Sequence, residues 1–257
     1  MQSDVLTYSV EDAICTITLN RPDSLNSFDR ELRLDLLKAI ETAEADKSVR
    51  VVILKGAGKG FCAGADLAEG VADGVEDQLK NEYKPCLMAI KNSAKPFIAQ
   101  IHGPAAGIGA AFALACDIVI MADEAFMYLA FAAIGIIPDG GLNWQLYNIL
   151  GPRKAFEIIA EGKRISAQDC LQFGMCNEVV PAQELEAAVL KRAEKLAQGA
   201  PLSQAAVKKV LQQMEGMDLS QAIDLEAEVQ QSVVETEDCR NAIAAFFRKE
   251  KPVFNGR

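Results

Sequence analysis

Histidine and basic residues are scarce in this chain, and each shortage excludes a class of function. The single histidine, His102, has no cysteine or acidic partner in metal-ligand spacing, so no metal site is expected. The 26 basic residues stand against 36 acidic ones, which leaves a net charge of −10. Because an acidic chain is repelled by polyanions, we expect neither nucleic acid nor an anionic membrane as a partner.

Long apolar runs and patterned cysteines are also missing. No apolar segment reaches the ~20 residues that span a bilayer, since Asp117 interrupts the nearest one, 105–121. The N-terminus lacks a basic stretch followed by an apolar one, so no signal peptide is expected. The seven cysteines lack the spacing of a disulfide framework, which is typical of a reducing compartment. We therefore expect a cytoplasmic protein in which Cys15, Cys116 and Cys170 are small buried apolar residues.

Short apolar runs alternate with amphipathic segments over most of the chain. Strands are predicted at 14–19, 51–55, 97–101 and 118–121, and an amphipathic helix at 29–45. The polar, acidic segment 70–83 is expected to be mobile over the mouth of a pocket. After residue 200 the pattern becomes helical only, at 202–214, 219–234 and 237–249. We therefore predict an α/β core over residues 1–200 and a C-terminal helical region over 201–257.

Two glycine-rich junctions follow predicted strands. The stretch 102–117 passes through Gly103, Gly107 and Gly109 into small and apolar residues, and 56–67 makes a similar turn after 51–55. Glycine lets the backbone approach a ligand closely, and the first N–H groups of a helix have no partner within it. Together the two junctions could direct backbone donors at one oxygen, although each alone is equally compatible with tight packing.

Short motifs in a fixed order extend over nearly the whole chain. They occupy residues 17–22, 25–28, 61–66, 95–96, 102–103, 107–109, 115–117, 135–138, 162–167 and 174–175. On these motifs the chain resembles the crotonase (enoyl-CoA hydratase/isomerase) superfamily. The resemblance implies a spiral of strand–strand–helix units followed by a helical trimerisation region. It also implies acyl-CoA thioester substrates, with coenzyme A as part of the substrate and no separate cofactor.

The resemblance assigns roles to individual residues in the two junctions. The paired backbone N–H groups that hold the thioester oxygen while an enolate forms correspond to Ala65 and Ile108. The segment that lies along coenzyme A corresponds to Ala63, Ala65, Asp66 and Leu67.

A further coenzyme A contact is implied at the C-terminus. Phe246 and Lys249 match a Phe and a Lys that approach the adenine at a subunit boundary. Apolar positions throughout the C-terminal helices are too many for so short a region to bury by itself. We therefore expect a homotrimer or a dimer of trimers.

The acid–base residues depart from the family's hydratase pattern. Ala111 and Phe131 stand where hydratases of the family carry glutamates, and neither can transfer a proton. Asp139 stands where the isomerases carry an acid, and one carboxylate suffices to move a proton between two carbons. The sequence therefore predicts an isomerase that shifts a double bond from the 3 to the 2 position of an acyl-CoA. An apolar surrounding for this acid is expected from Phe131, Leu142, Trp144 and Tyr147.

Other interpretations stay open. A hydratase or another crotonase-type reaction remains possible if Asp139 or a water takes over the missing roles, as does a non-catalytic acyl-CoA-binding relative. Asp139 also lies in Pro-Asp-Gly-Gly, which is an ordinary turn sequence. A dinucleotide-binding oxidoreductase is disfavoured, because Phe112 replaces the third glycine of that fingerprint. The sequence does not reveal the acyl group.

Overall fold

The computed structural model describes residues 3–70 and 74–257. A six-stranded sheet with the order β1-β2-β3-β4-β6-β9 forms its centre. Its strands are β1 (Leu6–Glu11), β2 (Ile14–Leu19), β3 (Val51–Gly56), β4 (Phe97–Ile101), β6 (Ile118–Ala122) and β9 (Glu178–Val180). The first two strands pair antiparallel, and every later pair is parallel. A second sheet contains β5 (Pro104–Ala106), β7 (Phe126–Tyr128) and β8 (Arg164–Ser166).

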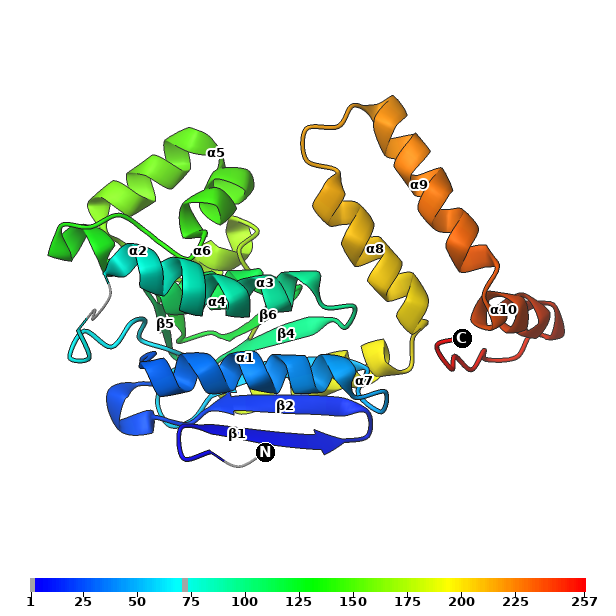
Figure 1. Ribbon diagram of the computed structural model, residues 1–257, viewed down its shortest axis with the longest axis horizontal. Helices are drawn as coiled ribbons and strands as arrows, with labels where there is room; N and C mark the ends of the chain where they lie inside the picture. Colours follow the sequence, from blue (N-terminus) through cyan, green and yellow to red (C-terminus); the bar gives the residue numbers. More distant parts are fainter. Residues whose placement is uncertain (1–2, 71–73) are drawn as a thin grey trace.

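Helices cover both sheets, which confirms the expected α/β class (Figure 1). The longer helices of the core are α1 (Arg30–Ala45), α3 (Lys84–Asn92), α4 (Ile108–Ala115), α5 (Leu142–Glu161), α6 (Ala167–Gln172) and α7 (Leu185–Ala197). Short turns of helix are η1 (Pro22–Ser24), α2 (Val75–Gln78), η2 (Leu79–Tyr83), η3 (Ala130–Ile134) and η4 (Ala182–Glu184). The π-helix η2 joins α2 to α3, so most of the segment that we expected to be mobile is helical. Residues 71–73 of that segment lie outside the described residues.

The central parallel strands β3 and β4 are mostly apolar because both faces of the sheet are covered. All five residues of β4 are buried, and β3 is buried at every position but Lys55. Consecutive parallel strands end at the same edge of a sheet. The two glycine-rich junctions leave β3 and β4 at their carboxyl ends, so the sheet brings these junctions together.

Three helices stand beside the core at the C-terminus: α8 (Pro201–Gln213), α9 (Leu219–Val234) and α10 (Glu237–Arg248) (Figure 1). The Lys208 ammonium anchors α8 to the core by donating to the Ile90 carbonyl, the Lys95 carbonyl and the Asp117 carboxylate. Asp117 also accepts from the Phe97 N–H at the start of β4, which is the structural role that its position indicates.

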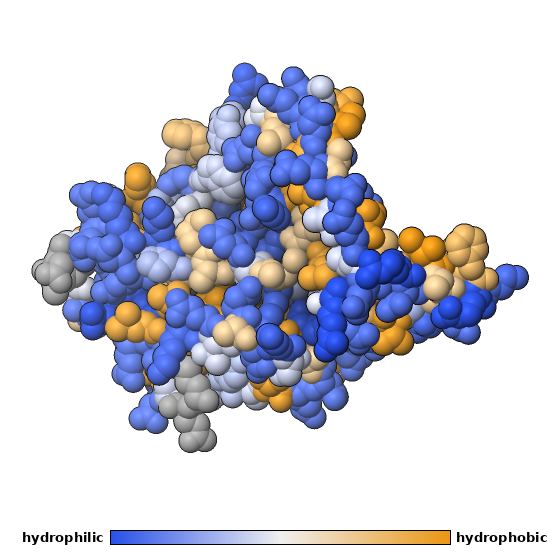
Figure 2. Space-filling model, turned by 45° about the vertical axis from the view of Figure 1, so that its right-hand side comes forward, coloured by the Kyte–Doolittle hydropathy of each residue, from blue (hydrophilic) through white to orange (hydrophobic). Residues whose placement is uncertain are grey.

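The C-terminal helices expose large apolar side chains among charged ones, and hydrophobic and hydrophilic residues both appear on the projection at the right of Figure 2. Exposed apolar residues of α9 and α10 include Leu219, Ile223, Ile243, Phe246 and Phe247. Across the described ranges, no helix combines the length and the apolar character that crossing a membrane requires.

Candidate active site

The two glycine-rich junctions run side by side. The Phe61 N–H donates to the Pro104 carbonyl over 3.0 Å, and the Ala106 N–H donates to the Cys62 carbonyl over 2.8 Å. A Cβ atom added at Gly107 would lie 3.7 Å from the Gly64 Cα. Because these two glycines touch, the residues that follow them, Ala65 and Ile108, are neighbours across the seam.

Several backbone donors around this seam are used. The Phe28 N–H donates to the Gly64 carbonyl, the Asp66 N–H donates to the Phe28 carbonyl, and the Gly107 N–H donates to the Tyr128 carbonyl. Within residues 3–70 and 74–257, neither the Ala65 N–H nor the Ile108 N–H donates to a protein acceptor. Ile108 is the first residue of α4, where an N–H group has no partner in its own helix. Two adjacent main-chain donors are therefore available to a ligand.

Asp139 lies against the first turn of α4. The next residue, Gly140, has φ +60°, and a Cβ there would lie 2.7 Å from the Ile108 Cγ1 and 3.2 Å from the Ala111 Cβ. The Asp139 carbonyl accepts from the Leu142 N–H, so its backbone does form a turn into α5. Its side chain has a different environment, since Oδ1 is buried and has no hydrogen-bond partner among the described residues.

The Asp139 carboxyl is more basic than an ordinary aspartate. Burial disfavours the ionised form and raises its pKa from 3.8 to about 6. A pKa near neutrality suits a group that must both accept and return a proton. The turn and the raised pKa of the carboxyl coexist, because the main chain makes the turn while the side chain is buried.

An apolar cavity of about 950 Å³ opens in front of Asp139. The side chains of Val75, Leu79, Leu87, Met88, Ile136 and Ile137 line it. Of the residues expected around this acid, Phe131 and Leu142 are buried. Trp144 and Tyr147 are 52% and 56% exposed, and neither is among the described residues that line this cavity. Helices α2 to α3 supply the apolar wall instead, and it went unrecognised because their sequence is rich in charge.

The two positions of the hydratase glutamates adjoin the same site. Ala111 is buried beneath Gly140, and the Phe131 ring comes to 3.9 Å from the position of a Cβ at Gly107. Both side chains therefore present hydrocarbon to the region between Asp139 and the free donors.

The residues expected along coenzyme A fall into two groups. Ala63, Asp66 and Leu67 lie in the loop that carries Ala65, and Leu67 is 74% exposed. Asp66 is held by Arg21, whose guanidinium donates to the carboxylate over 2.9 Å, and this bond lowers the Asp66 pKa. Phe246 and Lys249 belong to the C-terminal projection, and α10 lies far from α4 in Figure 1. A single chain does not bring these last two residues to the site.

Two other sequence predictions concern metals and polar residues nearby. The His102 ring contacts the Gly58 carbonyl through Nε2 at 3.0 Å, as a structural histidine would. Among the residues with described positions, no group of three His, Cys, Asp or Glu side chains could hold a metal ion. All seven cysteines are free, and Cys15, Cys116 and Cys170 are buried as expected.

Sequence reasoning missed one buried charge beside the site. Arg33 of α1 is only 2% exposed and binds two glutamates and a carbonyl. The signal was present, because Arg33 precedes Leu36 by three residues and Ile40 by seven, which places it on the buried face of α1.

Comparisons with known proteins show which family this chain and its fold belong to. The sequence model of the family described as enoyl-CoA hydratase/isomerase matches residues 9–257. The chain is 35% identical over 259 residues to a protein of Rhodobacter capsulatus named probable enoyl-CoA hydratase, with 100% of both chains covered. It is 34% identical over 254 residues to the 1,2-epoxyphenylacetyl-CoA isomerase of Escherichia coli, over 96% of this chain and 97% of that one. A crystal structure of enoyl-CoA hydratase from Bacillus anthracis superimposes with a TM-score of 0.92 at 32% identity, over 98% of this chain and 100% of that one.

Proposed function

Since this chain belongs to the enoyl-CoA hydratase/isomerase family and has its crotonase fold, we propose that it moves a double bond within an acyl-CoA thioester. The buried and unpaired Asp139 carboxylate beside two free backbone donors is the observation that carries this proposal. The reaction converts a 3-enoyl-CoA into the conjugated 2-enoyl-CoA.

One acid and two donors are sufficient for this chemistry. The Asp139 carboxylate removes a proton from C2, and the electron pair moves toward the thioester oxygen to give a dienolate. The Ala65 and Ile108 N–H groups bind that oxygen as its negative charge develops. The protonated Asp139 then returns the proton to C4, the double bond settles between C2 and C3, and no atom is gained or lost.

The apolar surroundings favour this route over hydration. Hydration requires a water to be positioned and activated, and the hydrocarbon of Ala111 and Phe131 offers it no carboxylate. Exclusion of water also protects the dienolate from protonation by solvent. Hydration is the alternative reaction, because several relatives of this chain are named as hydratases.

A purified-protein assay separates the alternatives. With a 3-enoyl-CoA we expect the absorbance of the conjugated thioester to rise, because the product is conjugated. With a 2-enoyl-CoA we expect almost no loss of that absorbance, because hydration is slow. Hydration as fast as isomerisation would refute the proposal, and binding without any turnover would identify a non-catalytic relative.

A ring-epoxide thioester is a second substrate to test. The relative from Escherichia coli is named for isomerisation of 1,2-epoxyphenylacetyl-CoA, and it is similar to this chain over nearly its whole length. A single acid beside an oxyanion site also suits rearrangement of an epoxide. Turnover of this substrate in preference to a 3-enoyl-CoA would assign the chain to that branch of the isomerases.

The pH profile should report the basicity of Asp139. Its raised pKa of about 6 means that the carboxyl is protonated, and hence unable to act as a base, below that pH. We expect kcat/KM for isomerisation to fall about tenfold per pH unit below this value and to be level above it. Glu76→Gln removes another carboxylate at the cavity and should leave this limb unchanged. A limb near pH 4, or one that disappears in Glu76→Gln, would assign the titration to another group.

We also propose assembly into a trimer or a dimer of trimers. Exposed apolar residues on α9 and α10 support it, because patches of this kind usually mark an interface. The distance of Phe246 and Lys249 from α4 within one chain supports it as well, since their expected contact with coenzyme A then needs a second copy.

A further inference from the structure

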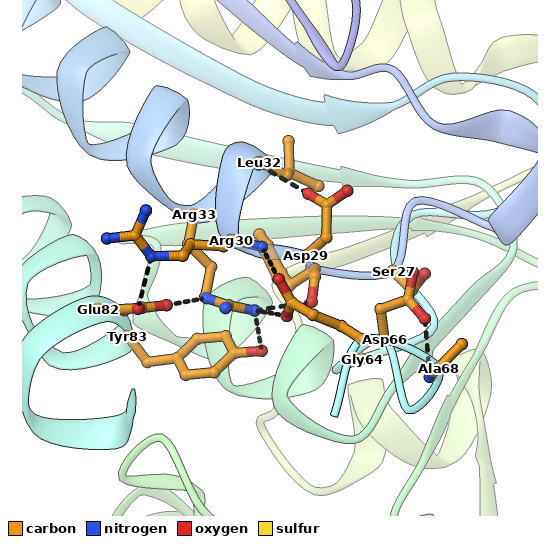
Figure 3. Close-up of polar contacts among 12 residues, drawn as sticks. Ser27, Asp29, Arg30, Leu32, Arg33, Gly64, Asp66, Ala68, Glu82 and Tyr83 are labelled. Carbon is orange, nitrogen blue, oxygen red and sulfur yellow. Dashed lines mark hydrogen bonds and ion pairs between the residues drawn. The ribbon is translucent and has the colours of Figure 1, made fainter. Parts of the chain in front are cut away.

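Arg33 forms a buried ionic centre between α1 and the walls of the candidate site (Figure 3). Its Nε donates to Glu82 over 2.6 Å, and its Nη1 donates to Glu69 over 2.9 Å and to the Phe28 carbonyl over 3.0 Å. The guanidinium also lies over the Tyr83 ring, 5.0 Å from its centroid. Burying a charge is costly unless it is paired and fully hydrogen-bonded, so this arrangement strongly fixes the positions of its partners.

The Phe28 carbonyl connects this centre to the oxyanion site. The same carbonyl accepts from Arg33 and from the Asp66 N–H, while the Phe28 N–H donates to the Gly64 carbonyl. Phe28 therefore holds the residues on both sides of Ala65, and Arg33 holds Phe28. Glu69 reinforces the same loop, because it also accepts from the Arg30 N–H at the start of α1.

A second set of contacts connects the centre to the opposite wall. Glu82 and Tyr83 belong to η2, whose first residue, Leu79, lines the cavity. The Phe28 ring packs 4.6 Å from the ring of Phe112 on α4, the helix that begins with Ile108. Burial raises the pKa of the Tyr83 hydroxyl, and the charge and hydrogen bond of Arg33 act against this rise. Arg33 thus contacts both the loop that contains Ala65 and the helix η2 that forms part of the apolar cavity wall.

We propose that Arg33 is a positioning residue that sets the place of the Ala65 N–H relative to the Ile108 N–H and so determines how strongly the site polarises a thioester carbonyl. The inference rests on the proposed function only in assigning these two donors to the thioester oxygen. It does not depend on whether the later chemistry is isomerisation or hydration.

Three variants test the role. Arg33→Met keeps an unbranched apolar stem and removes every donor. Arg33→Lys keeps the charge, but a single ammonium cannot reproduce the planar fork that reaches a carbonyl and two carboxylates. Arg30→Met is the matched control, because Arg30 is on the same helix and pairs with the same Glu82 at 3.2 Å while its side chain is 67% exposed.

The readout is the absorption of bound 4-dimethylaminocinnamoyl-CoA, whose conjugated carbonyl shifts to longer wavelength when it is polarised. We expect a shift with the wild type and with Arg30→Met, and loss of most of it with both Arg33 variants. On the reactive substrate, kcat should fall roughly 10–100-fold in the Arg33 variants with little change in KM, because misplaced donors weaken the transition state more than binding. A merely structural role would lower the melting temperature without changing the shift.

Each outcome decides the matter. A full shift in either folded Arg33 variant overturns the inference, as does an equal loss in Arg30→Met. If Arg33→Met does not fold, Arg33→Lys decides alone, and failure of both to fold would make Arg33 a folding residue and overturn the inference. A wild type that shifts the probe but isomerises nothing refutes the proposed reaction and leaves the Arg33 test valid. A wild type that gives no shift overturns the assignment of the donors and this inference with it.

Discussion

Replacing Asp139 by Asn is expected to lower isomerisation by roughly 10²–10⁴-fold, because an amide of the same shape cannot accept the C2 proton. Affinity for acyl-CoA should change little, because an amide of the same shape fills the same space and the substitution leaves the main-chain donors of Ala65 and Ile108 in place. Steady-state rates and equilibrium binding measure the two effects separately. Asp139→Glu, which keeps a carboxylate, should retain more activity than Asn. Near-normal turnover by Asp139→Asn would leave Asp139 with its turn role alone.

Asp139→Asn should also raise the free energy of unfolding. The folded-state pKa of Asp139 is raised, so the folded protein holds this proton more tightly than the unfolded chain does. Ionised Asp139 therefore destabilises the fold above pH about 6, and the penalty disappears as the pH falls below the ordinary pKa of 3.8. Asp139→Asn should raise the free energy of unfolding at pH 7 by on the order of 1–3 kcal/mol, and by much less at pH 4. Urea titrations at the two pH values would show this, and a destabilised variant would contradict the buried, unpaired environment of the carboxylate.

Gly109→Ala should abolish most activity without touching any side chain of the site. A Cβ at Gly109 would lie 2.6 Å from the Cys62 carbonyl oxygen and 2.9 Å from its Sγ, so the two glycine-rich junctions must move apart. The proposed donors are main-chain groups, so the added methyl group misaligns them directly by moving the backbone. We expect kcat to fall at least ~10²-fold, the effect of losing one oxyanion donor.

Gly174→Ala controls for the general cost of replacing glycine. Gly174 has φ +75° and open space around its Cα, so a side chain there strains the backbone without meeting other atoms. The Gly174→Ala variant should lose about 1 kcal/mol of unfolding free energy and keep the kcat of the wild type. A Gly109→Ala variant that melts like Gly174→Ala and keeps wild-type kcat would show that the two donors do not act on the reacting oxygen.

Sequence patterns predicted the parts of the fold whose signal is local. The continuous apolar runs at 97–101 and 118–121 are β4 and β6, and the helix predicted at 219–234 is α9. The three-residue strands β5, β7, β8 and β9 were not predicted, because an alternation of apolar and polar residues cannot be recognised in so few residues. These short strands are nonetheless important, since the Ala105 bridge to Cys62 aligns the two junctions.

The candidate site was predictable where a family motif names a position, and much less so where packing decides. The resemblance pointed to Asp139, Ala65 and Ile108, and the structure places Asp139 and the two loops together. The cavity wall was not predictable, because Leu79 and Met88 become a wall only by facing Ile136 and Ile137 from a distant part of the chain. A sequence does not show which backbone N–H groups lack an acceptor, since every residue except proline has one.

The contact between the Ile108 side chain and Gly140 makes one residue a spacer between two reacting groups. The main chain of Ile108 offers its donor, while its side chain fills the gap in front of the turn that carries Asp139. On the proposed function, the width of this side chain contributes to the separation between the acid and the oxygen-binding donors. A change in its volume retunes that separation while both chemical groups stay in place. On the proposed function, exchanging hydrocarbon at Ile108 should therefore alter which carbon receives a proton.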